Sequence, residues 1–122
     1  MHRSMMQVYV QSATEAIALY QRAFDATLLS LAQGDDGTVF HSELDVHGQI
    51  VALSDAPGER IPGNTMQFVL HFEADQQDTV RRAYDALCEG GLIEVPLGPC
   101  FYSPCMGSVT DRFGVRWCVF TS

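Results

Sequence analysis

The sequence contains no apolar run long enough to cross a membrane, for which roughly 18 residues are needed. Its first residues also lack the apolar segment and the small-residue cleavage site of a secretory signal. Basic residues are few: 7 stand against 15 acidic residues, which gives a formal net charge of −8. Because such a surface repels phosphate backbones, we expect no nucleic-acid partner. We expect a cytoplasmic protein that does not bind a membrane.

The motifs of several enzyme classes are missing as well. No nucleophile elbow, P-loop or dinucleotide-binding glycine motif occurs. The cysteines form no C-x-x-C pair of the kind that structural zinc sites use. Nothing points to an oxidising compartment, so we predict that all of them are free thiols. These cysteines are Cys88, Cys100, Cys105 and Cys118.

What the sequence does contain is an order of predicted strands and a helix that occurs once in each half. The first half shows it as follows. Met5 to Val10 alternates between two kinds of side chain and predicts a strand. Ser12 to Glu15 has the pattern of a capping box, which predicts that a helix begins there. The apolar face of this helix consists of Ala13, Ile17, Tyr20 and Phe24. Three more strands are predicted over residues 28–32, 39–46 and 49–54.

The second half repeats this order after a proline- and glycine-rich segment, residues 55–64. A strand is predicted over residues 66–73, a helix over about 75–89, and strands over 92–95, 106–110 and 115–121, with a loop over 96–104. Each half ends on a D-x-x-G turn that leads into a final strand, at Asp45 to Gly48 and at Asp111 to Gly114. The fold class is therefore α+β, with two β-α-β-β-β modules at about residues 5–58 and 64–122 that make a single domain.

Several stretches resemble a known family. They are the helix over residues 15–24, the segments 41–44 and 52–56, the helix end over residues 83–91, Pro96, Phe101 with Tyr102, Met106 with Gly107, and the closing segment 110–117. The chain is thereby similar to the vicinal oxygen chelate (glyoxalase, bleomycin resistance and dioxygenase) superfamily, in its PhnB-like branch. The resemblance implies a cupped, mainly antiparallel eight-stranded sheet with the helices on its convex face, a glyoxalase-like fold. It also implies a homodimer.

The resemblance further implies four cavity-facing positions that hold metal ligands in catalytic members. Carried over by local pattern, these positions are Met5, Ala52, Gln67 and Cys118. This set does not suit a divalent metal, which prefers imidazole and carboxylate ligands in such folds. We therefore predict no cofactor. The alternative is a metal-dependent enzyme with displaced ligands such as His41, Glu43 and His71.

Strand alternation predicts which residues line the cavity. Phe68, Leu70 and Phe72 must face the helices, since leaving such side chains in water forfeits about 1.5–3 kcal/mol each. The same alternation places Trp117 under the helices. The residues that remain for ligand binding are Gln67, His71, Arg116 and Cys118 in the cavity, His41 near its wall, and Phe101 and Tyr102 at its mouth.

Other interpretations of these residues stay open. Arg116 could bind an anion in the cavity or form a salt bridge with Asp111. His41 and Glu43 could form a pocket pair or belong to an exposed polar face. Phe101 and Tyr102 could close over a ligand or pack on the core. The sequence thus predicts a protein that binds a small organic molecule of unidentified class, with a metal-dependent lyase, isomerase or dioxygenase and an antibiotic-sequestering protein as alternatives.

Overall fold

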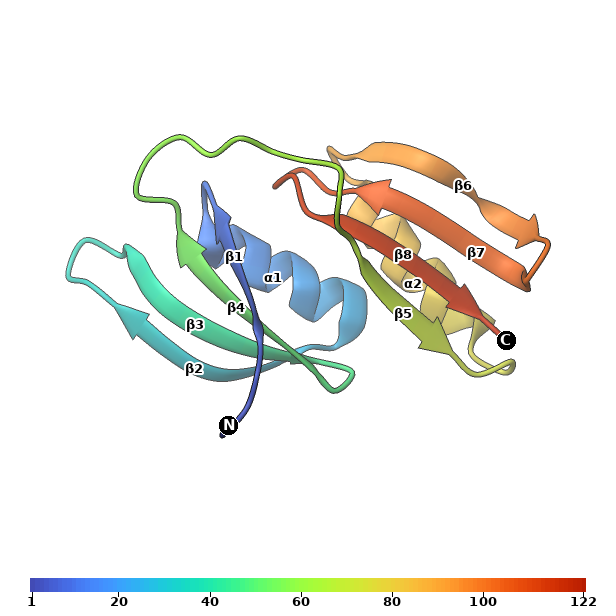
Figure 1. The fold of residues 1–122 in the computed structure, drawn as a ribbon, viewed down its shortest axis with the longest axis horizontal. Helices are drawn as coiled ribbons and strands as arrows, with labels where there is room; N and C mark the ends of the chain where they lie inside the picture. Colours follow the sequence, from blue (N-terminus) through green and yellow to red (C-terminus); the bar gives the residue numbers. More distant parts are fainter. The chain divides into compact units, whose positions relative to one another are not determined.

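A computed structural model describes all 122 residues, which divide into two units, Met1–Ile61 and Pro62–Ser122. The division falls in the proline- and glycine-rich segment, residues 55–64. Figure 1 shows each unit as a four-stranded sheet with one helix on one of its faces. The predicted order β-α-β-β-β therefore occurs twice, and the α+β fold class is confirmed. Neither helix is long and apolar enough to cross a membrane.

The first unit follows the predicted element bounds closely. Its elements are β1 (Met6–Val10), α1 (Ala13–Phe24), β2 (Thr27–Gln33), β3 (Val39–Val46) and β4 (Gln49–Asp55). The strand order is β1-β4-β3-β2, with β1 parallel to β4 and the other pairs antiparallel. The predicted apolar face of α1 is buried, as expected for a helix covering one side of a sheet.

One hydroxyl group and one carboxylate group fix the start of α1. Ser12 is the N-cap, and its side chain accepts a hydrogen bond from the backbone N–H of Glu15. Asp55, at the end of β4, accepts hydrogen bonds from the backbone N–H groups of Ala13 at 2.7 Å and Val39 at 2.8 Å. Asp55 thus joins the helix to the start of β3, which gives it a structural role.

The second unit consists of β5 (Phe68–Phe72), α2 (Gln77–Cys88), β6 (Leu92–Cys100), β7 (Ser103–Thr110) and β8 (Arg116–Thr121). Its strand order, β5-β8-β7-β6, matches that of the first unit. The parallel pair is β5 with β8, and the other pairs are antiparallel. All four cysteines of the chain are free thiols, as predicted.

The prediction of a loop over residues 96–104 is wrong. β6 continues to Cys100 and β7 begins at Ser103, so that only Phe101 and Tyr102 form the turn between them. Pro96 and Pro99 favoured the loop interpretation because proline cannot donate a hydrogen bond to a neighbouring strand. β6 is an edge strand, however, and its pairing with β7 contains three register irregularities. An edge strand of this kind accommodates proline.

The two D-x-x-G turns form as predicted. Gly48 and Gly114 have φ angles of +93° and +85°, which glycine adopts at little cost. In the first turn, the carboxylate of Asp45 accepts a hydrogen bond from the backbone N–H of Gly48 at 2.7 Å. In the second turn, Asp111 accepts hydrogen bonds from the backbone N–H groups of Phe113 and Val115.

Candidate functional site

The helix covers one face of the second unit's sheet and leaves the opposite face, here called the open face, without a helix. A Cβ atom added at Gly107 would lie 2.5 Å from a ring carbon of Tyr84 in α2, so Gly107 marks the covered face. Val119 lies opposite Gly107 in the register of β7 and β8. The alternation of β8 therefore puts Trp117 and Val119 under the helix, and Arg116, Cys118 and Phe120 on the open face.

The strand phase predicted from the sequence is thus confirmed. Trp117 stacks on Phe68 with 4.6 Å between ring centroids, and both lie on the covered face. Val69 pairs with Cys118 in the register of β5 and β8, so these two share the open face. His71, two residues after Val69, points to the same side. His71 and Cys118 therefore project from one face of the sheet and Trp117 from the other.

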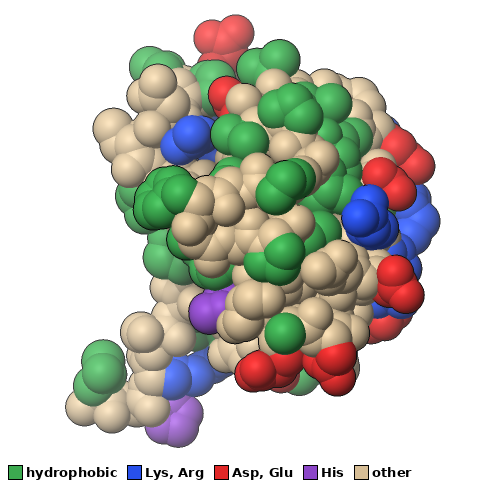
Figure 2. Space-filling model, turned by 90° about the vertical axis from the view of Figure 1, so that its right-hand side faces the viewer, with side chains coloured by type: hydrophobic (Ala, Val, Ile, Leu, Met, Phe, Trp, Pro, Cys, Tyr) green, Lys and Arg blue, Asp and Glu red, His purple; other side chains and the backbone are tan.

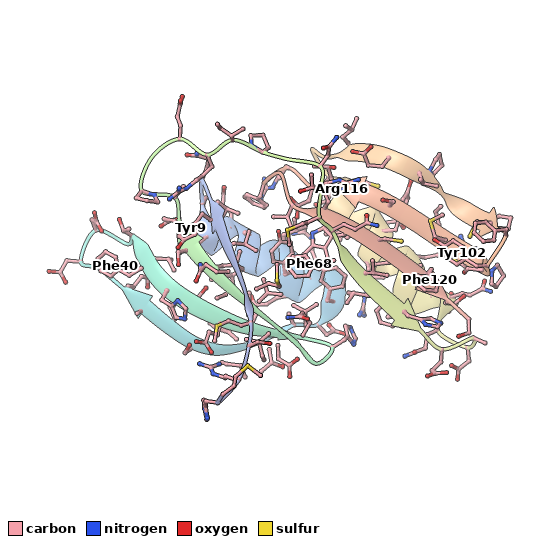
Figure 3. All side chains as sticks on the ribbon, in the orientation of Figure 1. Tyr9, Phe40, Phe68, Tyr102, Arg116 and Phe120 are labelled. Carbon is pink, nitrogen blue, oxygen red and sulfur yellow. The ribbon has the colours of Figure 1, made fainter.

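A row of aromatic rings crosses one end of the open face. His71 stacks on Phe120 with 4.4 Å between ring centroids and 16° between planes. Tyr102 meets Phe120 edge-on at 5.2 Å, and Phe101 meets Tyr102 edge-on at 5.0 Å. Figure 3 shows Phe120 and Tyr102 near the end of β8. Phe101 is 98% exposed and Tyr102 is 46% exposed, so the outer half of this ring row presents a large apolar area to solvent.

The Cys118 thiol lies beneath this ring row. The Tyr102 hydroxyl donates a hydrogen bond to its sulfur, with the Cys100 thiol close by. Burial raises the pKa of Cys118 above its ordinary value, and the bond from Tyr102 only partly opposes this. Burial also raises the pKa of Tyr102. Cys118 is therefore a protonated, shielded thiol at neutral pH and a poor nucleophile.

The other end of the open face contains a hollow with a volume of about 410 Å³. Leu92, Thr110 and Arg116 are cross-strand neighbours on β6, β7 and β8 and form its floor. The residues that complete its lining are Pro62, Gly63, Asn64 and Glu94. Figure 3 shows Arg116 at this end, near the beginning of β8. The open face thus has a charged end and an aromatic end.

Arg116 does not form the salt bridge with Asp111 that the sequence left open. Its Nη1 atom donates hydrogen bonds to the backbone oxygens of Asn64 at 3.0 Å and Met66 at 3.2 Å. Asp111 is 3% exposed and instead accepts a hydrogen bond from the indole nitrogen of Trp117 at 2.9 Å. The Arg116 guanidinium therefore reaches the hollow without a carboxylate partner.

Gln67 is displaced from its predicted place. The strand expected over residues 66–73 begins only at Phe68, and Gln67 is an exposed residue just before it. The backbone oxygen of Met66, the residue before Gln67, accepts a hydrogen bond from Arg116. The structure brings together His71, Arg116, Cys118, Phe101 and Tyr102 on one unit, and places Gln67 outside the regular part of the open face.

His41 lies in the first unit, and its nearness to the residues of the second unit stays a prediction. It forms a pair with Glu43, as one interpretation of the sequence proposed: His41 Nε2 lies 2.8 Å from a carboxylate oxygen of Glu43. Arg3 donates hydrogen bonds to both oxygens of this carboxylate, one of them at 3.0 Å. The side chain of Glu43 is only 11% exposed. The hydrogen bonds from Arg3 and then His41 lower the pKa of Glu43 from 4.5 to about 2.

The four positions carried over for metal ligands also shift. The strand register pairs Ala52 with Gln7 and Cys118 with Val69. Met5 and Gln67 each lie one residue before their strand. The residues that actually pair with Ala52 and Cys118, Gln7 and Val69, lie two positions further along the chain than the local pattern indicated. Gln7 and Ala52 offer one amide in the first unit, Val69 and Cys118 offer one thiol in the second, and neither pair fits a divalent metal. No group of three or more His, Cys, Asp or Glu side chains is placed to hold a metal ion.

Sequence reasoning did not single out Phe120, Glu94, Asn64 or Arg3. Phe120 could have been found, because it continues the alternation of Arg116 and Cys118 along the last strand. Asn64 and Arg3 lie outside every helix and strand, where no periodicity indicates what a side chain contacts. Glu94 lies on an edge strand whose pairing is irregular, so alternation did not predict its face.

Comparison with known proteins gives consistent results. The family model of the Glyoxalase/Bleomycin resistance protein/Dioxygenase superfamily matches residues 3–119. Protein YjdN of Escherichia coli is 27% identical, over 91% of this chain and 88% of its own length. The structure of the PhnB protein from Bacillus cereus matches with a TM-score of 0.82 at 22% identity, over 99% of this chain and 100% of that chain. The fosfomycin resistance protein FosX from Listeria monocytogenes matches with a TM-score of 0.72 at 11% identity, over 97% and 91% of the two chains. The resemblance drawn from the sequence and its glyoxalase-like fold are confirmed.

The ion pair at Glu43 predicts a pH dependence. An Arg3→Ala variant should raise the pKa of Glu43 back towards 4.5, as measured by NMR titration of its carboxyl carbon. Because the folded-state pKa lies below the ordinary value, the ionised carboxylate stabilises the fold above pH 4.5, and this contribution is lost as the pH falls to about 2. Arg3→Ala should therefore weaken the dependence of the urea midpoint on pH in that window. An Arg81→Ala control on α2 should leave both quantities unchanged, and an unaltered Glu43 titration in Arg3→Ala would refute the assignment.

Proposed function

Since the chain belongs to the Glyoxalase/Bleomycin resistance protein/Dioxygenase superfamily, we propose that it binds a small organic molecule with a planar ring on the open face of its second unit. The observation that carries this proposal is the row of rings formed by His71, Phe120, Tyr102 and Phe101. Binding takes place without a metal ion, and its location is the cytoplasm.

The ring row suits a planar ligand for two reasons. One of its ring contacts is stacked and the other two are edge-on, so the rings support one another and lose little freedom when a ligand settles on them. Exposed aromatic side chains in a cluster are uncommon on a protein surface unless they contact a partner. A planar ligand that covers Tyr102 and Phe101 removes apolar area from water, at about 25 cal/mol per Å².

The middle of the open face is an uncharged surface without a reactive side chain. Cys118, Met106 and Ser108 lie there and are each less than one-tenth exposed. The raised pKa of Cys118 keeps its thiol neutral, so the floor beneath a ligand carries no charge. A floor of this kind supports binding more readily than covalent catalysis.

The residues that would serve as displaced metal ligands are engaged elsewhere, which supports metal-free binding. Both carboxylate oxygens of Glu43 accept hydrogen bonds from Arg3. His41 bonds to the same carboxylate, and His71 Nε2 lies 2.7 Å from the Ser122 hydroxyl. A metal at these residues would have to break the ion pair of Arg3 with Glu43 and would place its charge near a guanidinium.

We also propose that two copies of the chain form a homodimer. The edge strands β2 and β6 expose several large apolar side chains, among them Leu29, Leu31, Ile93 and Val95. In the view of Figure 2, which looks from the right-hand side of Figure 1, hydrophobic side chains gather near the centre, and acidic ones lie at the top, right-hand and lower edges. A symmetric pair is the commonest way to cover apolar edges of this kind.

Ring contacts predict how an aromatic probe binds. A Phe120→Leu variant should bind 3-(4-biphenylyl)propionate about two- to twelve-fold more weakly than the unaltered protein, since an aromatic pair contributes about 0.5–1.5 kcal/mol beyond its buried area. Calorimetric titration measures this. Tyr9→Leu is the control: Tyr9 is an aromatic residue that is 48% exposed and packs under Arg60, but it belongs to the first unit. Equal weakening by both variants, or by neither, would contradict the proposed location.

The donor set predicts the metal content. Protein produced in medium supplemented with divalent metals should contain much less than one zinc, nickel, iron or manganese ion per chain. Elemental analysis of the purified protein measures this. One metal ion per chain that a chelator removes would show that Gln7, Ala52, Val69 and Cys118 are the wrong positions to consider, and would favour the enzyme alternative.

The exposed edge strands predict the oligomeric state. Light scattering at micromolar concentration should give a mass of twice the 13.5 kDa of one chain. A mass of 13.5 kDa across the concentration range would overturn the dimer while leaving the ligand site of the second unit as it stands.

A further inference from the structure

The hollow at the charged end of the open face contains two charged groups that the ring row at the aromatic end lacks. Its lining contains one guanidinium, that of Arg116, and one carboxylate, that of Glu94. The two side chains come from β8 and from the edge strand β6, with Thr110 of β7 between them. A volume of about 410 Å³ suits the head group of a small molecule.

Arg116 retains donors that the protein does not use. A guanidinium has five N–H donors, and both hydrogen bonds to backbone oxygens come from its Nη1 atom. The chain has 15 acidic residues for 7 basic ones, all of which are arginine, so carboxylate partners are abundant. Arg3 takes such a partner in the first unit, but Arg116 does not. Its Nε and Nη2 atoms are left to bind an anionic group, a task for which the planar guanidinium is well suited.

Glu94 is also held by a hydrogen bond and has no cationic partner. One of its carboxylate oxygens accepts a hydrogen bond from the Thr110 hydroxyl at 2.8 Å, which holds the side chain against the sheet. No arginine lies within ion-pair distance of it. Glu94 and Arg116 thus line one hollow, hold opposite charges, and remain too far apart to neutralise each other.

We propose that this hollow binds an amphoteric head group, whose anionic part contacts Arg116 and whose ammonium part contacts Glu94. The proposal rests on the proposed function, because the planar part of the same ligand lies on the ring row. A ligand with only an anion would leave Glu94 facing it with like charge, and one with only a cation would face Arg116. The paired charges therefore select for the zwitterion and against either single charge.

The length of the ligand follows from the strand. Arg116 and Phe120 are four residues apart on β8, which corresponds to about 13 Å at the rise of an extended chain. A biphenyl group with a short linker and a charged head spans about this distance. Three probes share the biphenyl group and differ only in the head: 4-phenylphenylalanine is zwitterionic, 3-(4-biphenylyl)propionate is anionic, and 2-(4-biphenylyl)ethylammonium is cationic.

The test is calorimetric titration of the full chain with these three probes. The zwitterion should bind more tightly than the anion by about two- to five-fold, the range expected for a partly exposed ion pair. Glu94→Gln should remove this advantage and leave the affinity for the anion unchanged or higher. Arg116→Gln should weaken both carboxylate-bearing probes about ten-fold and spare the cation. Thermal melts check that the fold is intact: Glu94→Gln should match the unaltered protein, and Arg116→Gln should still unfold cooperatively but at a somewhat lower temperature, because it loses the hydrogen bonds to Asn64 and Met66.

The outcomes separate the two proposals. If Phe120→Leu weakens all three probes but the zwitterion binds no better than the anion, the head-group assignment is overturned and the proposed function stands. If Glu94→Gln weakens the anion as much as the zwitterion, the carboxylate does not contact the ammonium and the assignment is likewise overturned. If none of the probes binds to the unaltered protein, the proposed function fails and this inference fails with it.

Discussion

The hydrogen bond from the Trp117 indole to the buried carboxylate of Asp111 determines how the last strand is oriented. The other oxygen of this carboxylate holds the D-x-x-G turn through the backbone N–H groups of Phe113 and Val115. The turn and the indole are therefore fixed by one group, and β8 can enter the sheet only with Trp117 under α2. The alternate side chains of β8, those of Arg116, Cys118 and Phe120, must then point away from the helix. The charged end, the thiol and the ring row of the open face all follow from this one constraint on strand phase.

The sequence was sufficient for the element order and for the faces of most strands, because burial imposes alternation wherever a helix covers one face. It was insufficient for β6, where Pro96 and Pro99 indicate a loop by composition alone. Whether proline ends a strand depends on whether its missing N–H would have met a neighbour, and that depends on the position of the strand in the sheet. The edge position of β6 is a tertiary fact that local sequence does not contain.

The candidate site was predictable to a similar depth. Alternation identified the side of the sheet on which His71, Arg116 and Cys118 lie, but it did not identify what they contact. The partners of Arg116 are backbone oxygens of Asn64 and Met66, which any residue would supply, so no side-chain pattern marks them. The same limit applies before β5: the carbonyl of Met66, next to Gln67, accepts from Arg116, which lies 50 positions further along the chain.

The two units share a topology and differ in whether the polar groups on the helix-free face of each sheet bond to one another. In the first unit, Ala52 lies between Gln7 and Glu43 in the strand register, and the polar groups around it bond to one another: Glu43 with Arg3 and His41, and Gln7 with Ser54. In the second unit, Cys118 holds the equivalent place between Val69 and Ser108. There the charges of Arg116 and Glu94 remain apart and the outer rings remain in solvent. A surface whose polar groups already bond to one another gains little from a ligand, whereas one with separated charges and exposed rings gains from both. The asymmetry between two similar sheets is the physical reason to place ligand recognition on the second.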